Sequence, residues 1–232
     1  MDEPVRFTFA GALAGVRRTV PLALSDLAVG IIFGALAHQA GVSLLEALLM
    51  SSLVYAGSAQ FVAVSLWTMP LPVVAIIVTT LVVNARYLLL GAALYPWFAR
   101  LSPLKVYGSF FLLADENWAL TIHEFEQGKR DAAFLVGSGL LLFISWGSTT
   151  LIGYLAGAII QDPAQWGLDF ACTAVFVALL TSMWKGKTNL LPWLVAAIVA
   201  IAAAHWLPGT WYILAGGLAG SIVGALTHAD PS

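Results

Sequence analysis

Apolar runs of membrane-spanning length follow one another along almost the whole chain. A transmembrane helix needs roughly 20 predominantly apolar residues. Runs close to that length lie near residues 20–37, 44–66, 73–94, 106–122, 132–160, 166–184, 190–206 and 211–226. Of the 232 residues, 60% are hydrophobic and 9% are charged, which is more apolar side chain than one soluble core can use. The chain is therefore predicted to be an all-α polytopic membrane protein with about seven or eight transmembrane helices.

The remaining composition narrows the possible functions. Many tryptophans and tyrosines stand near the ends of the runs, as in the aromatic belts of membrane proteins. The net charge of −2 predicts no nucleic-acid partner, and the single cysteine, Cys172, can form no disulfide within the chain. The polar connections are too short to hold a soluble enzyme core, and no side chains show metal-ligand spacing. We expect one transmembrane domain over residues 1–232, with no metal, no cofactor and no catalytic residues.

Two of the eight runs are interrupted by polar residues. The run 44–66 contains Tyr55-Ala-Gly-Ser-Ala-Gln60, which indicates a broken or re-entrant helix. Such backbone survives at membrane depth only where protein or water covers it. The run 106–122 carries Asp115-Glu116-Asn117 and would insert poorly by itself. Whether residues 44–67 span the bilayer or re-enter it stays open from these patterns.

The positions of lysine and arginine favour one topology. If all eight runs cross and the N-terminus is cytoplasmic, the cytoplasmic side receives Arg6, Arg17, Arg18, Lys129, Arg130, Lys185 and Lys187, and the outer side receives Arg100 and Lys105. Making the run 44–66 re-entrant nearly abolishes this bias. The positive-inside rule therefore favours eight crossing helices with both termini in the cytoplasm. Residues 26–35 and 169–178 share Asp, Ala, Phe and Ala at the same offsets, which suggests an inverted repeat.

Arg86 is the most demanding residue in the apolar runs. It lies near the middle of the run 73–94, where a guanidinium costs on the order of 3 kcal/mol to insert, so it must be paired or hydrated. The acidic groups at comparable depth are Asp26, Asp115, Glu116 and Asp169. Each is a candidate to pair with Arg86 or to carry a proton. In the alternative interpretation, Arg86 is locked permanently to Asp26 or Asp115 and only holds helices together.

The segment from Tyr55 to Phe61 offers small residues, hydroxyls and an amide where a helix can unwind. Freed backbone groups in such a segment can bind the carboxylate and ammonium of an amino acid. The simpler interpretation is that its small residues only pack helices closely. If the segment binds substrate, the candidate binding residues are Tyr55, Ser58 and Gln60, together with Asn84 and Arg86.

Five segments together resemble the AzlC family, the large subunits of bacterial branched-chain amino acid exporters. They are Ser-Asp-Leu-Ala-Val-Gly-Ile-Ile-Phe-Gly (25–34), Tyr-Ala-Gly-Ser-Ala-Gln-Phe (55–61), Asn-Ala-Arg-Tyr (84–87), Ala-Asp-Glu-Asn-Trp (114–118) and Gly-Leu-Asp-Phe (167–170). The resemblance implies a transporter domain of the inner membrane that works with a small AzlD-type membrane subunit. It also implies export of valine, leucine, isoleucine or related neutral amino acids such as methionine, in exchange for protons.

Two other classes of function stay open. An uncoupled channel for small solutes would use the same polar residues, and its flux would not respond to an uncoupler. A structural subunit would leave the transport site to its partner. An intramembrane enzyme is not expected, because the chain shows no nucleophile with a paired base and no metal set.

Overall fold

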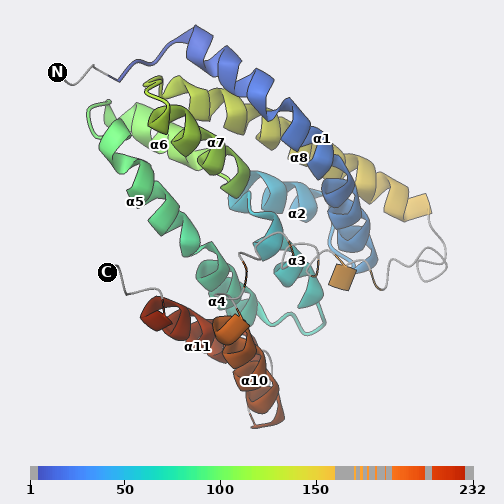
Figure 1. Ribbon diagram of the computed structural model, residues 1–232. Helices are drawn as coiled ribbons and strands as arrows, with labels where there is room; N and C mark the ends of the chain where they lie inside the picture. Colours follow the sequence, from blue (N-terminus) through green and yellow to red (C-terminus); the bar gives the residue numbers. More distant parts are fainter. Residues whose placement is uncertain are drawn as a thin grey trace.

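The computed structural model describes residues 5–159, 170, 173–174, 177, 181, 186, 190–206 and 211–227 (Figure 1). The longer helices are α1 (Phe9–Gln39), α4 (Val73–Asn84), α5 (Arg86–Phe98), α8 (Ala133–Ile159), α10 (Leu190–Trp206) and α11 (Trp211–Thr227). The shorter ones are α2 (Leu44–Leu49), the π-helical turn η1 (Met50–Val54), α3 (Gly57–Ser65), α6 (Pro103–Phe111) and α7 (Asp115–Glu126). Within the described residues, three helical stretches are long and apolar enough to cross a bilayer: Phe9–Gln39, Val73–Phe98 (α4 with α5) and Ala133–Ile159. The predicted all-α membrane fold is confirmed.

Helices α1 and α8 lie side by side and run in the same direction (Figure 1). Their starts are joined where the amide of Arg6 donates to the carbonyl of Arg130 (2.7 Å) and the amide of Ala132 donates to the carbonyl of Arg6 (3.0 Å). Glycines allow close approach along their length, because a Cβ at Gly34 or Gly153 would collide with backbone of the other helix. Backbone contact of this kind is a common source of helix association in membranes.

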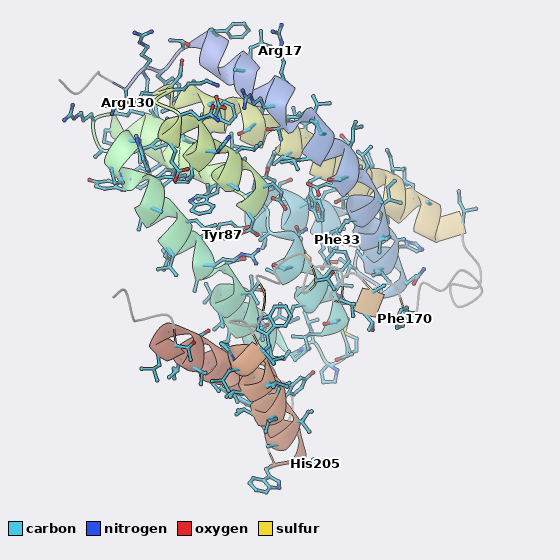
Figure 2. The ribbon with its side chains drawn as sticks, viewed as in Figure 1. Arg17, Phe33, Tyr87, Arg130, Phe170 and His205 are labelled. Atoms are coloured by element: carbon cyan, nitrogen blue, oxygen red, sulfur yellow. The ribbon has the colours of Figure 1, made fainter. Side chains whose placement is uncertain are left out.

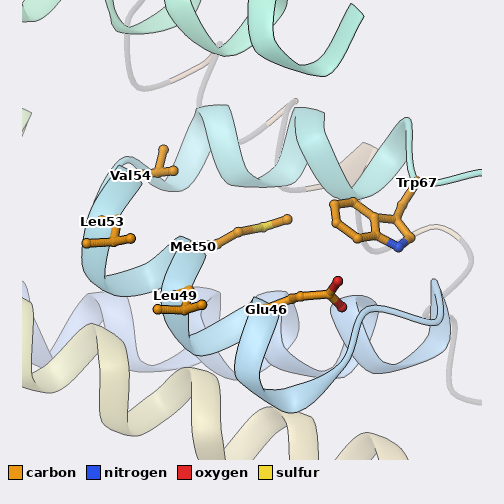
Figure 3. A pocket seen from close by; sticks show the side chains of 6 residues that line it. All are labelled: Glu46, Leu49, Met50, Leu53, Val54 and Trp67. Carbon is orange, nitrogen blue, oxygen red and sulfur yellow. The ribbon is translucent and has the colours of Figure 1, made fainter. Parts of the chain in front are cut away.

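The run 44–66 folds back on itself instead of forming one long helix. Helix α2 and turn η1 lead to Tyr55, whose left-handed backbone (φ 45°) ends the helix, and α3 then returns. The end of α3 packs beside the start of α2, because Val64 belongs to one buried cluster with Val42 and Ala47. Figure 3 shows the two arms facing each other across an apolar groove, with Glu46 on one arm opposite Trp67 at the end of the other. The sequence left open whether this segment crosses or re-enters the bilayer, and the structure has the broken, folded-back form, which we call the α2–α3 hairpin.

The run 106–122 also folds back. Helix α6 ends at Phe111 and α7 begins at Asp115, and Asn117 holds the turn between them. The Nδ2 of Asn117 donates to the carbonyl of Leu112 (2.7 Å), and its Oδ1 accepts from the amide of Ala114 (2.8 Å). Both arms return to the end of α5, where Phe98 contacts Phe110 and Phe125. We call this segment the α6–α7 hairpin, and it replaces the crossing helix expected from the sequence.

The two re-entrant hairpins change where the charges lie. Helices α4 and α5 together run from the end of the α2–α3 hairpin to the end that holds the N-terminal segment (Figure 1). Lys105, at the start of α6, lies over the ring of Phe7 (4.8 Å), and Figure 2 shows Arg17 and Arg130 at this same end. We call it the basic end; its members are Arg6, Arg17, Arg18, Arg100, Lys105, Lys129 and Arg130. Within the described residues, Arg86 is the one lysine or arginine that lies elsewhere.

The described residues contain an inverted arrangement of helices and hairpins. A long helix followed by a hairpin occurs twice: α1 with the α2–α3 hairpin, then α4 and α5 with the α6–α7 hairpin. The two long helices run in opposite directions, and the two hairpins enter from opposite ends, as in an inverted-topology repeat. The predicted match of residues 26–35 with 169–178 stays a prediction, because most of the second segment lies outside the described residues.

The last two helices form a pair of their own. A Cβ at Gly216 or Gly220 of α11 would lie 2.8 Å from atoms of Ala196 in α10, so these glycines let the two helices approach closely. Within the described part of the chain, α11 also packs against α4 (Figure 1). This pair therefore extends the bundle beside α4.

The α1–α8 contact predicts that one added methyl group is costly at Gly153. The Cβ of alanine there would collide with the backbone of Ile31, so we expect Gly153→Ala to lower the free energy of unfolding by about 1–3 kcal/mol. Gly147→Ala is the matched control in the same helix, because nothing in the described chain lies within 4 Å of its Cβ. Thermal unfolding in detergent measures both. Equal melting temperatures would contradict close α1–α8 packing.

The re-entrant topology predicts which loops share a side of the membrane. In a Cys172→Ser background, Ser43→Cys and Thr68→Cys flank the α2–α3 hairpin, and Ser102→Cys and Gln127→Cys flank the α6–α7 hairpin. We expect a membrane-impermeant thiol reagent to label the first pair from one side and the second pair from the other. Eight crossing helices would instead place the two members of each pair on opposite sides.

Candidate functional site

The tips of the two hairpins meet between α1 and α8. Tyr55 from the first tip and Ala114 from the second form one buried cluster with Ala23 of α1 and Leu142 of α8. Helices α3 and α7 both begin at this meeting point, and no side chain caps the first amides of α3. Unpaired amides and the helix dipole make a helix N-terminus attractive to an anion. The structure thus directs two helix N-termini toward one place near the middle of the bundle.

Arg86 joins the two tips. It is the first residue of α5, at the break that follows Asn84, and its Nη2 lies 2.8 Å from Oδ2 of Asp115 and donates to Oγ of Ser58 (2.9 Å). Ser58 is the second residue of α3 and Asp115 is the first residue of α7. The pair is partly open, since 32% of the Arg86 side chain and 46% of the Asp115 side chain are exposed. One guanidinium therefore connects three chain segments and remains accessible.

The break between α4 and α5 leaves polar atoms without partners. Oδ1 of Asn84 and Nε of Arg86 are buried and have no hydrogen-bond partner within the described residues. Buried acceptors and donors of this kind are costly when nothing pairs with them. In the same region the guanidinium of Arg86 lies over the ring of Tyr87, which Figure 2 labels beside α5 (5.2 Å). The break therefore offers one unused acceptor and one unused donor.

Tyr55 and Gln60 are held by α8. The hydroxyl of Tyr55 donates to the carbonyl of Gly139 (3.1 Å). Gln60 is 1% exposed; its Nε2 donates to Oγ of Ser51 (3.1 Å) and its Oε1 accepts from the indole of Trp146 (3.0 Å). The bonds to Gly139 and Trp146 fix the α2–α3 hairpin to α8, and the bond to Ser51 joins its two arms. Gln60 lies in this network and not beside Arg86.

The other acidic candidates lie at different places. Asp26 is in the middle of α1 and partly exposed, and Glu116 is in the first turn of α7 and exposed. Within the described residues neither forms an ion pair. Asp169 lies outside the described residues. No group of three or more His, Cys, Asp or Glu side chains in the described ranges is arranged to hold a metal ion.

A second charged cluster closes the basic end. Glu124 of α7 is nearly buried and binds two cations: Arg18 of α1 at 2.8 Å and Lys129 at 3.1 Å. Asp131 accepts from the amide and the hydroxyl of Thr8, which ties the N-terminal segment to the start of α8. The ion pair of Glu124 with Arg18 holds the outer part of the α6–α7 hairpin against α1.

The sequence interpretation missed the residues of α8 that support the tips. Trp146, Thr150 and Gly139 contact the α2–α3 hairpin, and Thr150 shares a hydrogen bond with Ser51 (2.9 Å). One signal was present: Trp146 stands in the middle of the run 132–160, whereas tryptophan in membrane proteins concentrates at the interfaces. A tryptophan at that depth needs an acceptor for its indole N–H.

Known proteins are similar to this chain over the segments that form the hairpin tips. Residues 21–160 match the model of the family described as "AzlC protein". An uncharacterized membrane protein of Helicobacter pylori (strain J99) is 31% identical over 198 residues, covering 84% of this chain and 85% of the relative. The "Branched-chain amino acid transport protein AzlC" of Bacillus subtilis is 27% identical, covering 90% and 81% respectively. The "Inner membrane protein YgaZ" of Escherichia coli is 28% identical, covering 93% and 88%. No solved structure matches.

The hydrogen-bond network of Gln60 predicts a stability effect. Gln60→Ala removes the acceptor of the Trp146 indole and one of the two partners of the Ser51 hydroxyl, and a buried donor left unpaired costs about 1–3 kcal/mol. We expect a clear fall in the melting temperature of the purified protein. Ser65→Ala, on the same helix, is the control, because that exposed hydroxyl donates to its own helix at Val62. A Gln60→Ala protein as stable as Ser65→Ala would contradict this role.

Proposed function

The chain belongs to the AzlC family, and we propose that it is an inner-membrane permease that exports branched-chain or related neutral amino acids in exchange for protons. Its substrates are valine, leucine and isoleucine, and also methionine. Membership of this family supports a role in membrane transport. The name of the Bacillus subtilis relative refers to transport of branched-chain amino acids. The direction of transport, the coupling to protons and a small AzlD-type partner subunit are parts of the proposal.

The accessible guanidinium between the hairpin tips is the observation that carries the proposal. An amino-acid carboxylate binds well to arginine and to helix N-termini, and Arg86 and the start of α3 offer both in one place. In this mechanism the substrate carboxylate reaches Arg86 beside Ser58 and competes with Asp115. The apolar neighbours Ala23, Leu142 and Phe143 suit an aliphatic side chain.

The hairpins provide a route for alternating access. The α2–α3 hairpin enters from one end and the α6–α7 hairpin from the basic end, so each can open the tips toward its own side. Because lysine and arginine favour the cytoplasmic side, we assign the basic end and the N-terminus to the cytoplasm. One proton moving inward across 100 mV supplies about 2.3 kcal/mol, enough for a roughly fifty-fold gradient of substrate.

The partner subunit has an exposed surface available. Of the three helical stretches of spanning length, Val73–Phe98 is the least buried, and its exposed side chains include Val74, Leu81, Leu88 and Leu89. Lipid or a small apolar membrane subunit can cover such a surface. Co-purification of this chain with the AzlD-type protein, and transport by each alone, tests that part of the proposal.

The transport experiment uses the chain and its partner subunit in proteoliposomes with an imposed proton gradient. We expect saturable valine flux that an uncoupler abolishes, whereas a channel would pass valine without saturation and without sensitivity to the uncoupler. Arg86→Ala removes the charge-assisted bond to the substrate carboxylate and is expected to lower valine flux about 10- to 100-fold. Arg17→Ala, exposed at the basic end, is the control and keeps wild-type flux.

A double variant separates substrate binding from a purely structural ion pair. Arg86→Ala leaves Asp115 unpaired, so loss of flux alone does not identify the cause. In Arg86→Ala/Asp115→Ala no charge of this pair is left uncompensated. If Arg86 binds the substrate, the double variant folds and still fails to transport valine. If the double variant transports at the wild-type rate, Arg86 serves only to hold the helices.

A further inference from the structure

Helix α7 presents two different faces. Its large apolar side chains pack in the cluster at the end of α5; they are Trp118, Ile122 and Phe125. The ring of Phe125 stacks on that of Trp97 in α5 (5.1 Å), and the indole of Trp118 donates to the carbonyl of Leu90 in α5 (3.1 Å). A second row along α7 is polar and buried, and we call it the polar row of α7; its members are Asn117, Thr121 and Glu124. The apolar face thus binds α7 to α5.

The polar row of α7 faces α1 and α8. Glu124 lies 2.8 Å from Nη1 of Arg18 in α1, and a Cβ at Gly139 of α8 would lie 2.9 Å from Nδ2 of Asn117. Within the described residues, the ion pair of Arg18 with Glu124 is the one polar side-chain bond between α7 and these two helices. An interface lined by polar groups exposes little apolar surface when it opens, so the hydrophobic effect opposes its opening only weakly.

Glu124 keeps a counter-ion when it leaves Arg18. Glu124 is 6% exposed, and its carboxylate also lies 3.1 Å from Nζ of Lys129. Lys129 follows α7 in the chain, and its amide donates to the carbonyl of Glu124 (3.1 Å), so it moves with α7. The side chain of Arg18 is 46% exposed and can be hydrated. Breaking a buried pair is strongly destabilising when it leaves one charge alone. Here neither charge is left alone, so the pair can separate.

A buried hydroxyl next to the ion pair has no partner. Thr19 follows Arg18 in α1 and is 0% exposed, and its Oγ1 forms no hydrogen bond within the described residues. A buried hydroxyl without a partner is costly. Water that enters beside Arg18 supplies that partner, which favours an open form of this interface.

The α2–α3 hairpin is held in a different way. Uncharged groups inside the protein bind it to α8; the bonds join Tyr55 to Gly139, Ser51 to Thr150 and Gln60 to Trp146. When such bonds break, buried donors and acceptors are left unpaired. Opening at the basic end, where the α6–α7 hairpin enters, therefore loses fewer interactions than opening at the other end.

We propose that the polar row of α7 lines the passage by which the transported amino acid reaches Arg86 from the basic end, and that the Arg18–Glu124 ion pair is the gate of this passage. When the α6–α7 hairpin moves away from α1, Lys129 neutralises Glu124 and water enters. The passage leads to the site because Asp115, the partner of Arg86, is the first residue of α7. Amide, hydroxyl and carboxylate groups can exchange hydrogen bonds with a zwitterion along the way. The inference rests on the proposed function, which supplies the substrate.

Thiol labelling in the polar row tests the passage. In the full chain with Cys172→Ser, Thr121→Cys places a thiol where the closed form buries it. Membrane vesicles that contain this chain and its partner subunit receive an impermeant thiol reagent on the side from which Gln127→Cys is labelled. We expect slow labelling of Thr121→Cys, at a rate set by the open fraction, and loss of valine flux once it is labelled. Gln127→Cys, exposed just after α7, is the control, which is labelled rapidly and keeps its flux.

Variants of the two cations test the gate. In the Thr121→Cys chain, Arg18→Ala is expected to raise the labelling rate about tenfold, because the closed form loses its ion pair. Arg18→Lys keeps a cation there and is expected to restore slow labelling. Arg17→Ala removes the neighbouring exposed charge and is the matched control, with an unchanged rate.

Lys129→Ala is expected to act in the opposite direction. Without Lys129, Glu124 is neutralised only while Arg18 binds it, so the open form is disfavoured and labelling slows severalfold. A cluster that only stabilises the fold would loosen in both variants, and labelling would then be faster in both. Lys129→Ala keeps the contact with α1, so it decides the question even if Arg18→Ala does not fold.

The outcomes separate the gate from the transport function. Unchanged labelling in Arg18→Ala, or faster labelling in Lys129→Ala, would overturn the gate. Labelling of Thr121→Cys that leaves valine flux intact, or sustained flux without any labelling, would overturn the passage. In these cases amino-acid transport itself still stands. Absence of valine flux in the unmodified complex would instead contradict the proposed function.

Discussion

The close contact between α1 and α8 is the interaction on which the remaining structure depends. Glycines allow the two backbones to approach closely, and both hairpins bind to the resulting pair of helices. The α2–α3 hairpin bonds to α8 through Gln60, Ser51 and Tyr55. The α6–α7 hairpin is tied to α1 by Glu124 and Arg18. Irregular backbone can survive at membrane depth because this scaffold shields it.

The scaffold explains why the charged residues gather where they do. Each hairpin ends its first helix near the middle of the bundle, so two helix N-termini and the break before Arg86 come together there. Arg86 reaches Ser58 on one tip and Asp115 on the other, and a ligand that competes for it acts on both hairpins at once. In a medium of low polarity, a change of one charge at this point alters the stability of either tip considerably. The site and the moving parts that we propose are thus the same residues.

Sequence patterns led to the correct class of fold and to most of the residues at the tips, but not to the topology. The count of lysine and arginine favoured eight crossings because it tested re-entry of the run 44–66 alone and not of both interrupted runs together. Two hairpins in succession reverse the chain twice, and Arg100 and Lys105 then join Arg6 and Lys129 at one end. Among the described residues, every lysine and arginine except Arg86 then lies at one end, because both interrupted runs fold back.

The sequence by itself determined that the chain is helical and lies in a membrane, because apolar runs of this length leave water and must satisfy their backbone internally. It also determined that Arg86 needs a partner, because the cost of a buried guanidinium does not depend on the fold. Only the tertiary structure decided which carboxylate that partner is. Asp115 and Asp26 are 29 and 60 residues from Arg86 in sequence, and neither distance says which one lies within 4 Å. The turn at Tyr55, the cap made by Asn117 and the packing of α1 on α8 set that choice, since they fix where the tips meet.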